Sequence, residues 1–103
     1  MASNKEFVEF TREQLGNLNI MIRPMMGEYL IYCDGKLFGG IYDNRLLIKK
    51  TKIGKELLPE AKEVFPYDGS KTLMLFVENL DDRDFLEKLI VSTCAELPLA
   101  KNK

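Results

Sequence analysis

The chain has 103 residues, with 46% hydrophobic residues, 30% charged residues, two cysteines, no histidine and a net charge of −1. This balance is typical of one globular domain that needs no disulfide or metal, and the near-neutral charge argues against strong attraction to nucleic acid or anionic membranes. Without histidine, histidine-based hydrolysis and histidine-ligated zinc are excluded. Two cysteines without metal-type spacing or a disulfide framework predict a reduced, cytoplasmic setting, and the absence of a signal segment or a run of ~20 apolar residues predicts no membrane partner.

The first predicted helix begins after Ser3 and ends near Gly16 and Asn17. Ser3 is placed to cap this helix, and Glu6, three residues on, completes the pattern of a capping box. Apolar residues at helical spacing then form one stripe that predicts the buried side of the helix. The stripe comprises Phe7, Val8, Thr11, Leu15 and Leu18.

From Asn19 to Lys50 the apolar period changes to two, which predicts a meander of antiparallel strands. Pro24 either ends the first strand or places it on a sheet edge, and a tight kink follows at Gly27. Asp34-Gly35 and Asp43-Asn44 are predicted two-residue turns between the next strands.

The second half of the chain predicts a short helix over Thr51 to Leu58, a brief strand over Glu63 to Tyr67 and a clear strand over Thr72 to Val77. The final helix is predicted to begin at Asp81 as its cap and to end at Pro98.

The predicted fold is therefore α+β, with two layers and the order α-β-β-β-β-α-β-β-α. An antiparallel sheet of five or six strands is packed by helices on one face. Residues 1–98 are predicted to form a single domain, and residues 99–103 a loose tail.

Two-residue turns fix the register of the strands, and the register assigns side chains to the two faces of the sheet. Pairing Cys33 with Lys36 and Ile31 with Phe38 predicts which side the helices cover. The reverse face, turned away from the helices, is then too apolar for a solvated surface, which favours self-association, a partner or a pocket. The alternative is that a helix or the tail folds over it. The predicted covered side carries Leu30, Tyr32, Leu37, Ile41, Leu46 and Ile48, and the predicted reverse face carries Tyr29, Ile31, Cys33, Phe38, Tyr42 and Leu47, with Lys36, Arg45 and Lys49.

A discontinuous motif resembles the signature of the TfoX N-terminal-domain family, which comprises competence regulators of the TfoX/Sxy type and small stand-alone relatives. The resemblance implies a fold similar to secretion-chaperone-like domains and no agreed catalytic residues. Full-length regulators carry a second domain for which this chain has no room, so a role in activating DNA-uptake genes is not expected. The motif consists of Arg23, Met26-Gly27-Glu28-Tyr29, Asp34-Gly35-Lys36, Phe38 and Arg45-Leu46, with Leu30 where family members often have Gly.

The leading hypothesis is a non-enzymatic interaction domain that forms a homodimer, or binds an unknown protein partner, through the reverse face. No catalytic residue, cofactor or metal is expected, and Cys33 and Cys94 are expected to be inert core residues. The predicted interface residues are Tyr29, Ile31, Phe38, Tyr42, Arg45 and Leu47.

Two alternatives stay open. A small ligand, or a minor enzymatic activity, would use a pocket around Arg23, Glu28 and Tyr29, although Arg23 and Glu28 also suit an ion pair that fixes the kink. Nucleic acid would stack on sheet aromatics beside basic residues, including a lysine cluster that equally suits a solvated edge. The possible ligand residues are eight residues of the motif, namely Arg23, Met26, Gly27, Glu28, Tyr29, Asp34, Gly35 and Lys36. The residues that could stack on bases are Tyr29, Phe38 and Tyr42, with Arg45 and Lys36, and the lysine cluster is Lys49, Lys50, Lys52 and Lys55.

Overall fold

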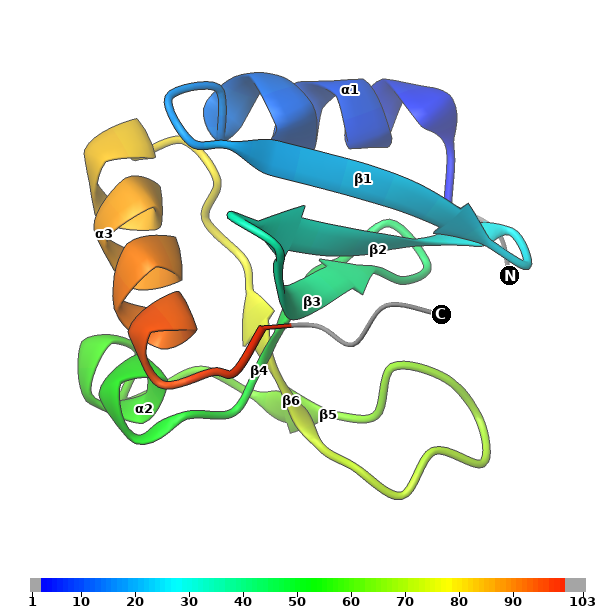
Figure 1. Cartoon of the computed structure of the whole chain (residues 1–103). Coiled ribbons are helices and arrows are strands. Elements are labelled where there is room, and N and C mark those ends of the chain that lie inside the picture. The colour runs from blue at the N-terminus through cyan, green and yellow to red at the C-terminus, as the bar shows by residue number, and fades with distance from the viewer. Residues whose placement is uncertain (1–2, 100–103) are drawn as a thin grey trace.

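The computed structural model describes residues 3–99 as three helices and six strands (Figure 1). In chain order the elements are α1 (Lys5–Gln14), β1 (Ile20–Met25), β2 (Glu28–Cys33), β3 (Lys36–Ile41), β4 (Leu46–Lys49), α2 (Lys52–Leu57), β5 (Glu63–Val64), β6 (Met74–Val77) and α3 (Arg83–Ala95). The strands form one antiparallel sheet in the order β1-β2-β3-β4-β6-β5, which confirms the predicted α+β fold and element order. Most of the predicted tail, residues 100–103, lies outside the described residues.

Three consecutive hairpins share one kind of turn. Met26-Gly27, Asp34-Gly35 and Asp43-Asn44 all have positive φ, between 51° and 88°. Two left-handed residues in succession are the mark of a type I′ turn, whose twist matches that of the flanking strands. The two predicted turns are confirmed, and the kink at Gly27 proves to be a third hairpin turn. Pro24 lies within β1 at the edge of the sheet.

One irregularity between β2 and β3 overturns the predicted face assignment. Cys33 pairs with Lys36 as predicted, but Ile31 pairs with Gly39 instead of Phe38. The ladder shifts by one residue between these pairs, which is the geometry of a β-bulge. Because side chains alternate with a period of two, one extra residue puts Phe38 and Ile41 on the same face.

The assignment is therefore correct for the end of β3 and for β4, and wrong for β2 and the start of β3. Ile31 and Phe38 are fully buried under the helices, and Tyr29 and Cys33 also face them. Leu30, which packs with Tyr42, Leu47 and Met74, lies on the reverse face. Residues placed correctly are Ile41, Leu46, Ile48, Tyr42, Leu47 and Lys49; those placed wrongly are Tyr29, Ile31, Cys33, Phe38, Leu30, Tyr32, Leu37 and Lys36.

Both long helices begin one residue later than predicted. The cap of α1 is Asn4, whose Oδ1 accepts a hydrogen bond from Phe7 N at 2.8 Å, and not Ser3. The cap of α3 is Asp82, whose Oδ1 accepts from Phe85 N at 3.0 Å, and not Asp81. A cap must reach the amide three residues on, and the Ser3 side chain is bonded elsewhere.

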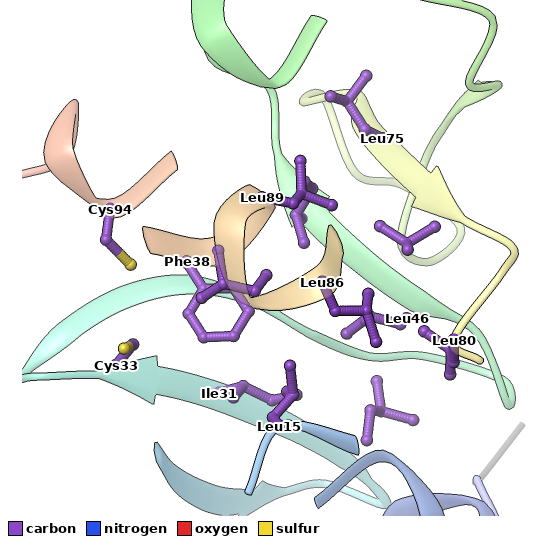
Figure 2. Close-up of a cluster of buried hydrophobic side chains, with 14 of the residues drawn as sticks. Leu15, Ile31, Cys33, Phe38, Leu46, Leu75, Leu80, Leu86, Leu89 and Cys94 are labelled. Carbon is purple, nitrogen blue, oxygen red and sulfur yellow. The ribbon is translucent and has the colours of Figure 1, made fainter. Parts of the chain in front are cut away.

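The main core lies between the sheet and the helices. Figure 2 shows Phe38 and Ile31 of the sheet among Leu86 and Leu89 of α3, with Leu15 following α1. These side chains are at most 2% exposed, so they belong to the fully buried centre of the main core. Within residues 3–99, no helix is both long and apolar enough to cross a membrane.

Candidate functional site on the reverse face

The Glu28 carboxylate belongs to a hydrogen-bond network at one end of the sheet. Oε1 accepts from Ser3 N at 3.1 Å and from Ser3 Oγ at 2.6 Å, while Oε2 accepts from Asp43 N at 2.9 Å. Asn44 N donates to Ser3 Oγ at 2.9 Å. Glu28 therefore ties the β3–β4 turn to the segment before α1, and this is why Ser3 does not cap that helix.

The three residues of the predicted ligand pocket point to different surroundings. Arg23 is exposed on β1, whereas Tyr29 packs against the core. The predicted Arg23–Glu28 ion pair is not found. The carboxylates that form salt bridges among residues 3–99 are those of Glu9 and Glu63. A hollow does open beside Glu28, but its lining contains neither Arg23 nor Tyr29.

The Asp-Gly-Lys part of the motif also supports the fold. Asp34 N donates to Asn19 O, and Asp34 Oδ1 accepts from Asn19 Nδ2, both at 3.0 Å. Lys36 Nζ donates to Cys94 O at 3.0 Å. This carbonyl lies in the last turn of α3, where a positive charge is stabilised by the negative end of the helix dipole. The surface predicted to stack on nucleic-acid bases is not formed. Lys36 is hydrogen-bonded to Cys94 O, and Tyr29 and Phe38 face the core.

The β1–β2 hairpin carries apolar side chains that the protein does not cover. Met26 is 99% exposed and occupies the left-handed region with φ 51°, where Gly, Asn or Asp is normally found. Met21 and Met25 are 54% and 39% exposed, and alternation along β1 places them with Arg23 on the reverse face. We call Met21, Arg23, Met25, Met26 and Tyr32, the cross-strand partner of Met21, the methionine patch.

The other half of the reverse face is partly covered by the loop of residues 65–73 between β5 and β6, visible at the lower right of Figure 1. The rings of Tyr42 and Tyr67 pack with centroids 6.3 Å apart. Arg45 fixes the loop by donating from Nη2 to Pro66 O at 3.5 Å. Burial raises the pKa of Tyr42 above its ordinary value. The predicted strand over Glu63 to Tyr67 is only two residues long because the chain leaves the sheet to form this cover.

A groove of about 420 Å³ remains between this loop and the sheet. We call it the lysine groove, because every charged residue that lines it is a lysine. Its lining is Leu30, Leu37, Gly39, Tyr42, Lys49, Lys50, Pro66, Tyr67, Ser70, Lys71, Thr72, Leu73, Met74 and Leu97.

The predicted interface residues do not lie on the open part of the reverse face. Ile31 and Phe38 are fully buried in the core, and Tyr29 faces it. Tyr42 and Leu47 face the expected way but are buried. Arg45 is occupied in holding the loop. The methionine patch was missed, although strand alternation along β1, combined with the Met26-Gly27 turn, contains the signal that locates it.

The two thiols, far apart in sequence, meet between β2 and α3 (Figure 2). Burial, followed by the nearby Asp34 charge, raises the pKa of Cys33. Burial also raises the pKa of Cys94 to about 11. Thiolate formation is opposed at both positions, as expected for core cysteines. No three Cys, Asp or Glu side chains in residues 3–99 gather as a metal ion would require.

These features define a small α+β domain whose sequence motif contributes to the hairpins, and whose methionine patch and lysine groove are the candidate sites on the reverse face. The model of the TfoX N-terminal domain matches residues 13–96, so the chain belongs to that family. The resemblance of the motif is thereby confirmed.

One relative is similar along almost its whole length. The "Uncharacterized 12.7 kDa protein in trpE 5′ region" of Spirochaeta aurantia is 31% identical over 102 residues, covering 98% of this chain and 89% of that protein. No solved structure matches the chain, so the likeness to secretion chaperones stays a prediction.

Proposed function

We propose that this protein is a non-enzymatic, cytoplasmic regulatory domain that acts as a homodimer, joined through the methionine patch. The observation that carries the proposal is Met26, an apolar side chain that is almost wholly exposed on a backbone conformation unfavourable to it. Within residues 3–99 the Met26 side chain joins neither apolar cluster, whereas the motif residues Glu28, Asp34 and Lys36 make hydrogen bonds that support the fold. A residue that costs stability and makes no contact inside the domain favours the interpretation that it contacts another molecule.

The composition of the patch suits contact with a second copy. Methionine side chains adapt to irregular surfaces, and Tyr and Arg are enriched at interfaces. Arg23 is the only charged residue of the patch, so an isologous pair would bury few charges. Three of its residues lie on one strand, which gives a continuous surface rather than scattered exposed side chains.

The edge of the sheet is a poorer route to association than its face. Pro24 has no N–H to donate, and Ile20 N already donates to Leu18 O at 3.0 Å. A strand added beside β1 would therefore find few free donors. This favours packing of the reverse faces over extension of the sheet.

Sedimentation velocity at tens of micromolar tests the proposal. The wild-type chain is expected to sediment as a dimer, and Met21→Lys as a folded monomer, because the substitution buries an unpaired charge in the interface. Val91→Lys is the matched control, since Val91 is 52% exposed on α3 and lies outside the patch. A monomeric wild type, or equal effects of the two substitutions, would overturn the proposal.

A further inference from the structure

We infer that the lysine groove binds a small organic anion with an apolar body, such as a medium-chain carboxylate. The inference does not depend on dimerisation, because the groove and the methionine patch share no residue. It rests on three observations: an apolar floor, a roof formed by the loop of residues 65–73, and charged lining residues that are all lysines.

The floor of the groove is formed by the sheet itself. A Cβ atom at Gly40 would lie 2.8 Å from Tyr42 Cε2, so glycine is what allows the Tyr42 ring to lie against its own strand. Leu30, Leu37 and Met74 continue this surface. Such a floor offers dispersion contacts to an alkyl or aryl body but few hydrogen bonds.

The loop of residues 65–73, which forms the roof, is held by hydrogen bonds at Pro66 and Ser70 and is exposed to solvent at Tyr67. Pro66 is buried and held by Arg45, and Ser70 Oγ exchanges hydrogen bonds with the backbone of Thr72 at 3.2 and 3.3 Å. The Tyr67 side chain is 58% exposed, so its ring has solvent-facing surface that a ligand can cover. A volume of about 420 Å³ is in the range of small-molecule sites, and too small for a folded partner.

The charges around the groove select the sign of the ligand. Lys50 Nζ is paired with Glu63 Oε1 at 2.9 Å, and Lys55 with Glu63 Oε2 at 3.0 Å. Lys49 and Lys71 have no carboxylate within 4.0 Å among residues 3–99. The groove therefore offers two lysines without an ionic partner beside an apolar floor, and a carboxylate on an apolar chain complements both features.

Titration with octanoate, octanol and octylammonium, followed by backbone amide NMR, tests the inference. Octanoate is expected to bind most tightly, to shift the amides of Gly39, Ser70 and Thr72, and to leave Val91 unmoved. The double variant Lys49→Gln/Lys71→Gln should weaken octanoate binding about tenfold without changing that of octanol. Lys88→Gln, an exposed lysine on α3, is the matched control.

Three results would overturn the inference. They are no binding of octanoate at millimolar concentration, equal binding of octanol and octanoate, and shifts confined to the β1–β2 hairpin. Met21→Lys separates this proposal from dimerisation, because that variant should lose the dimer and retain octanoate binding.

Discussion

Met26 combines two properties that rarely occur together in a stable protein. Its side chain is 99% exposed, and its φ of 51° places the backbone where residues with a Cβ atom are strained. The equivalent residues of the other two turns, Asp34 and Asp43, belong to a residue type that tolerates this conformation. Of these three turn residues, Met26 alone is apolar, and it is exposed to solvent at a cost in local stability.

We predict that Met26→Asn stabilises the monomer by about 0.5–1 kcal/mol, because Asn-Gly is a preferred type I′ sequence. The same substitution should weaken the dimer by removing an apolar contact. Urea unfolding at low protein concentration measures the first effect, and sedimentation the second. Asp43→Met, the reverse exchange at the equivalent position of the β3–β4 turn, should destabilise the chain. A less stable Met26→Asn monomer would argue against strain at this turn.

The buried thiol of Cys94 makes the stability of the fold depend on pH. Its pKa is raised to about 11 in the folded state by burial, from an ordinary value of 9.0. A raised pKa means that the folded state holds the proton more tightly, so this contribution to stability is complete below about pH 9 and is lost as pH rises toward 11.

We expect the free energy of unfolding to fall between about pH 9 and 11, with a shallower decline in Cys94→Val. Tyr42, whose pKa is also raised by burial, contributes in the same direction and leaves a residual slope. Urea titrations with reductant at each pH measure the difference. A slope unchanged by the substitution would show that Cys94 is not its source.

At the scale of the element, the β-bulge in β3 is the decisive feature of the sheet. Phe38 is fully buried against the helices, while Leu37 lines the lysine groove on the opposite face. In the uninterrupted register predicted from turn lengths, these roles are exchanged. The bulge therefore determines which aromatic and aliphatic side chains remain available on the reverse face.

Phe38→Ala is expected to cost about 3–5 kcal/mol, because it leaves a cavity in the main core. Leu37→Ala should cost about 1 kcal/mol, since Leu37 is partly exposed. Equilibrium urea unfolding of the two variants tests the assignment. Equal losses, or a larger loss for Leu37→Ala, would contradict the observed register.

At the scale of the whole molecule, Glu28 connects segments that are distant in sequence. Its carboxylate joins the residues before α1 to the β3–β4 turn, across sequence separations of 25 and 15 residues. Three donors converge on one carboxylate, an arrangement that stabilises the charged acceptor.

Glu28→Ala should lower the free energy of unfolding by about 2 kcal/mol, because it leaves the Ser3 and Asp43 donors without their acceptor. Glu56→Ala, at an exposed position of α2, is the control and should change it by less than about 0.5 kcal/mol. Amide exchange at Asp43 should accelerate in Glu28→Ala. Unchanged exchange would show that the network contributes little in solution.

The sequence alone determined the order of elements, two of the hairpin turns and the family, because these depend on neighbouring residues: apolar period, turn-forming pairs and a short motif. Tertiary structure decided which face of the sheet the helices cover, since one bulged residue inverts the alternation of everything before it. It also decided that Ser3 binds Glu28 instead of capping α1, and that the loop of residues 65–73 partly covers one half of the reverse face. Those outcomes depend on contacts between distant segments, whose free energies outweigh the local preferences from which a sequence is interpreted.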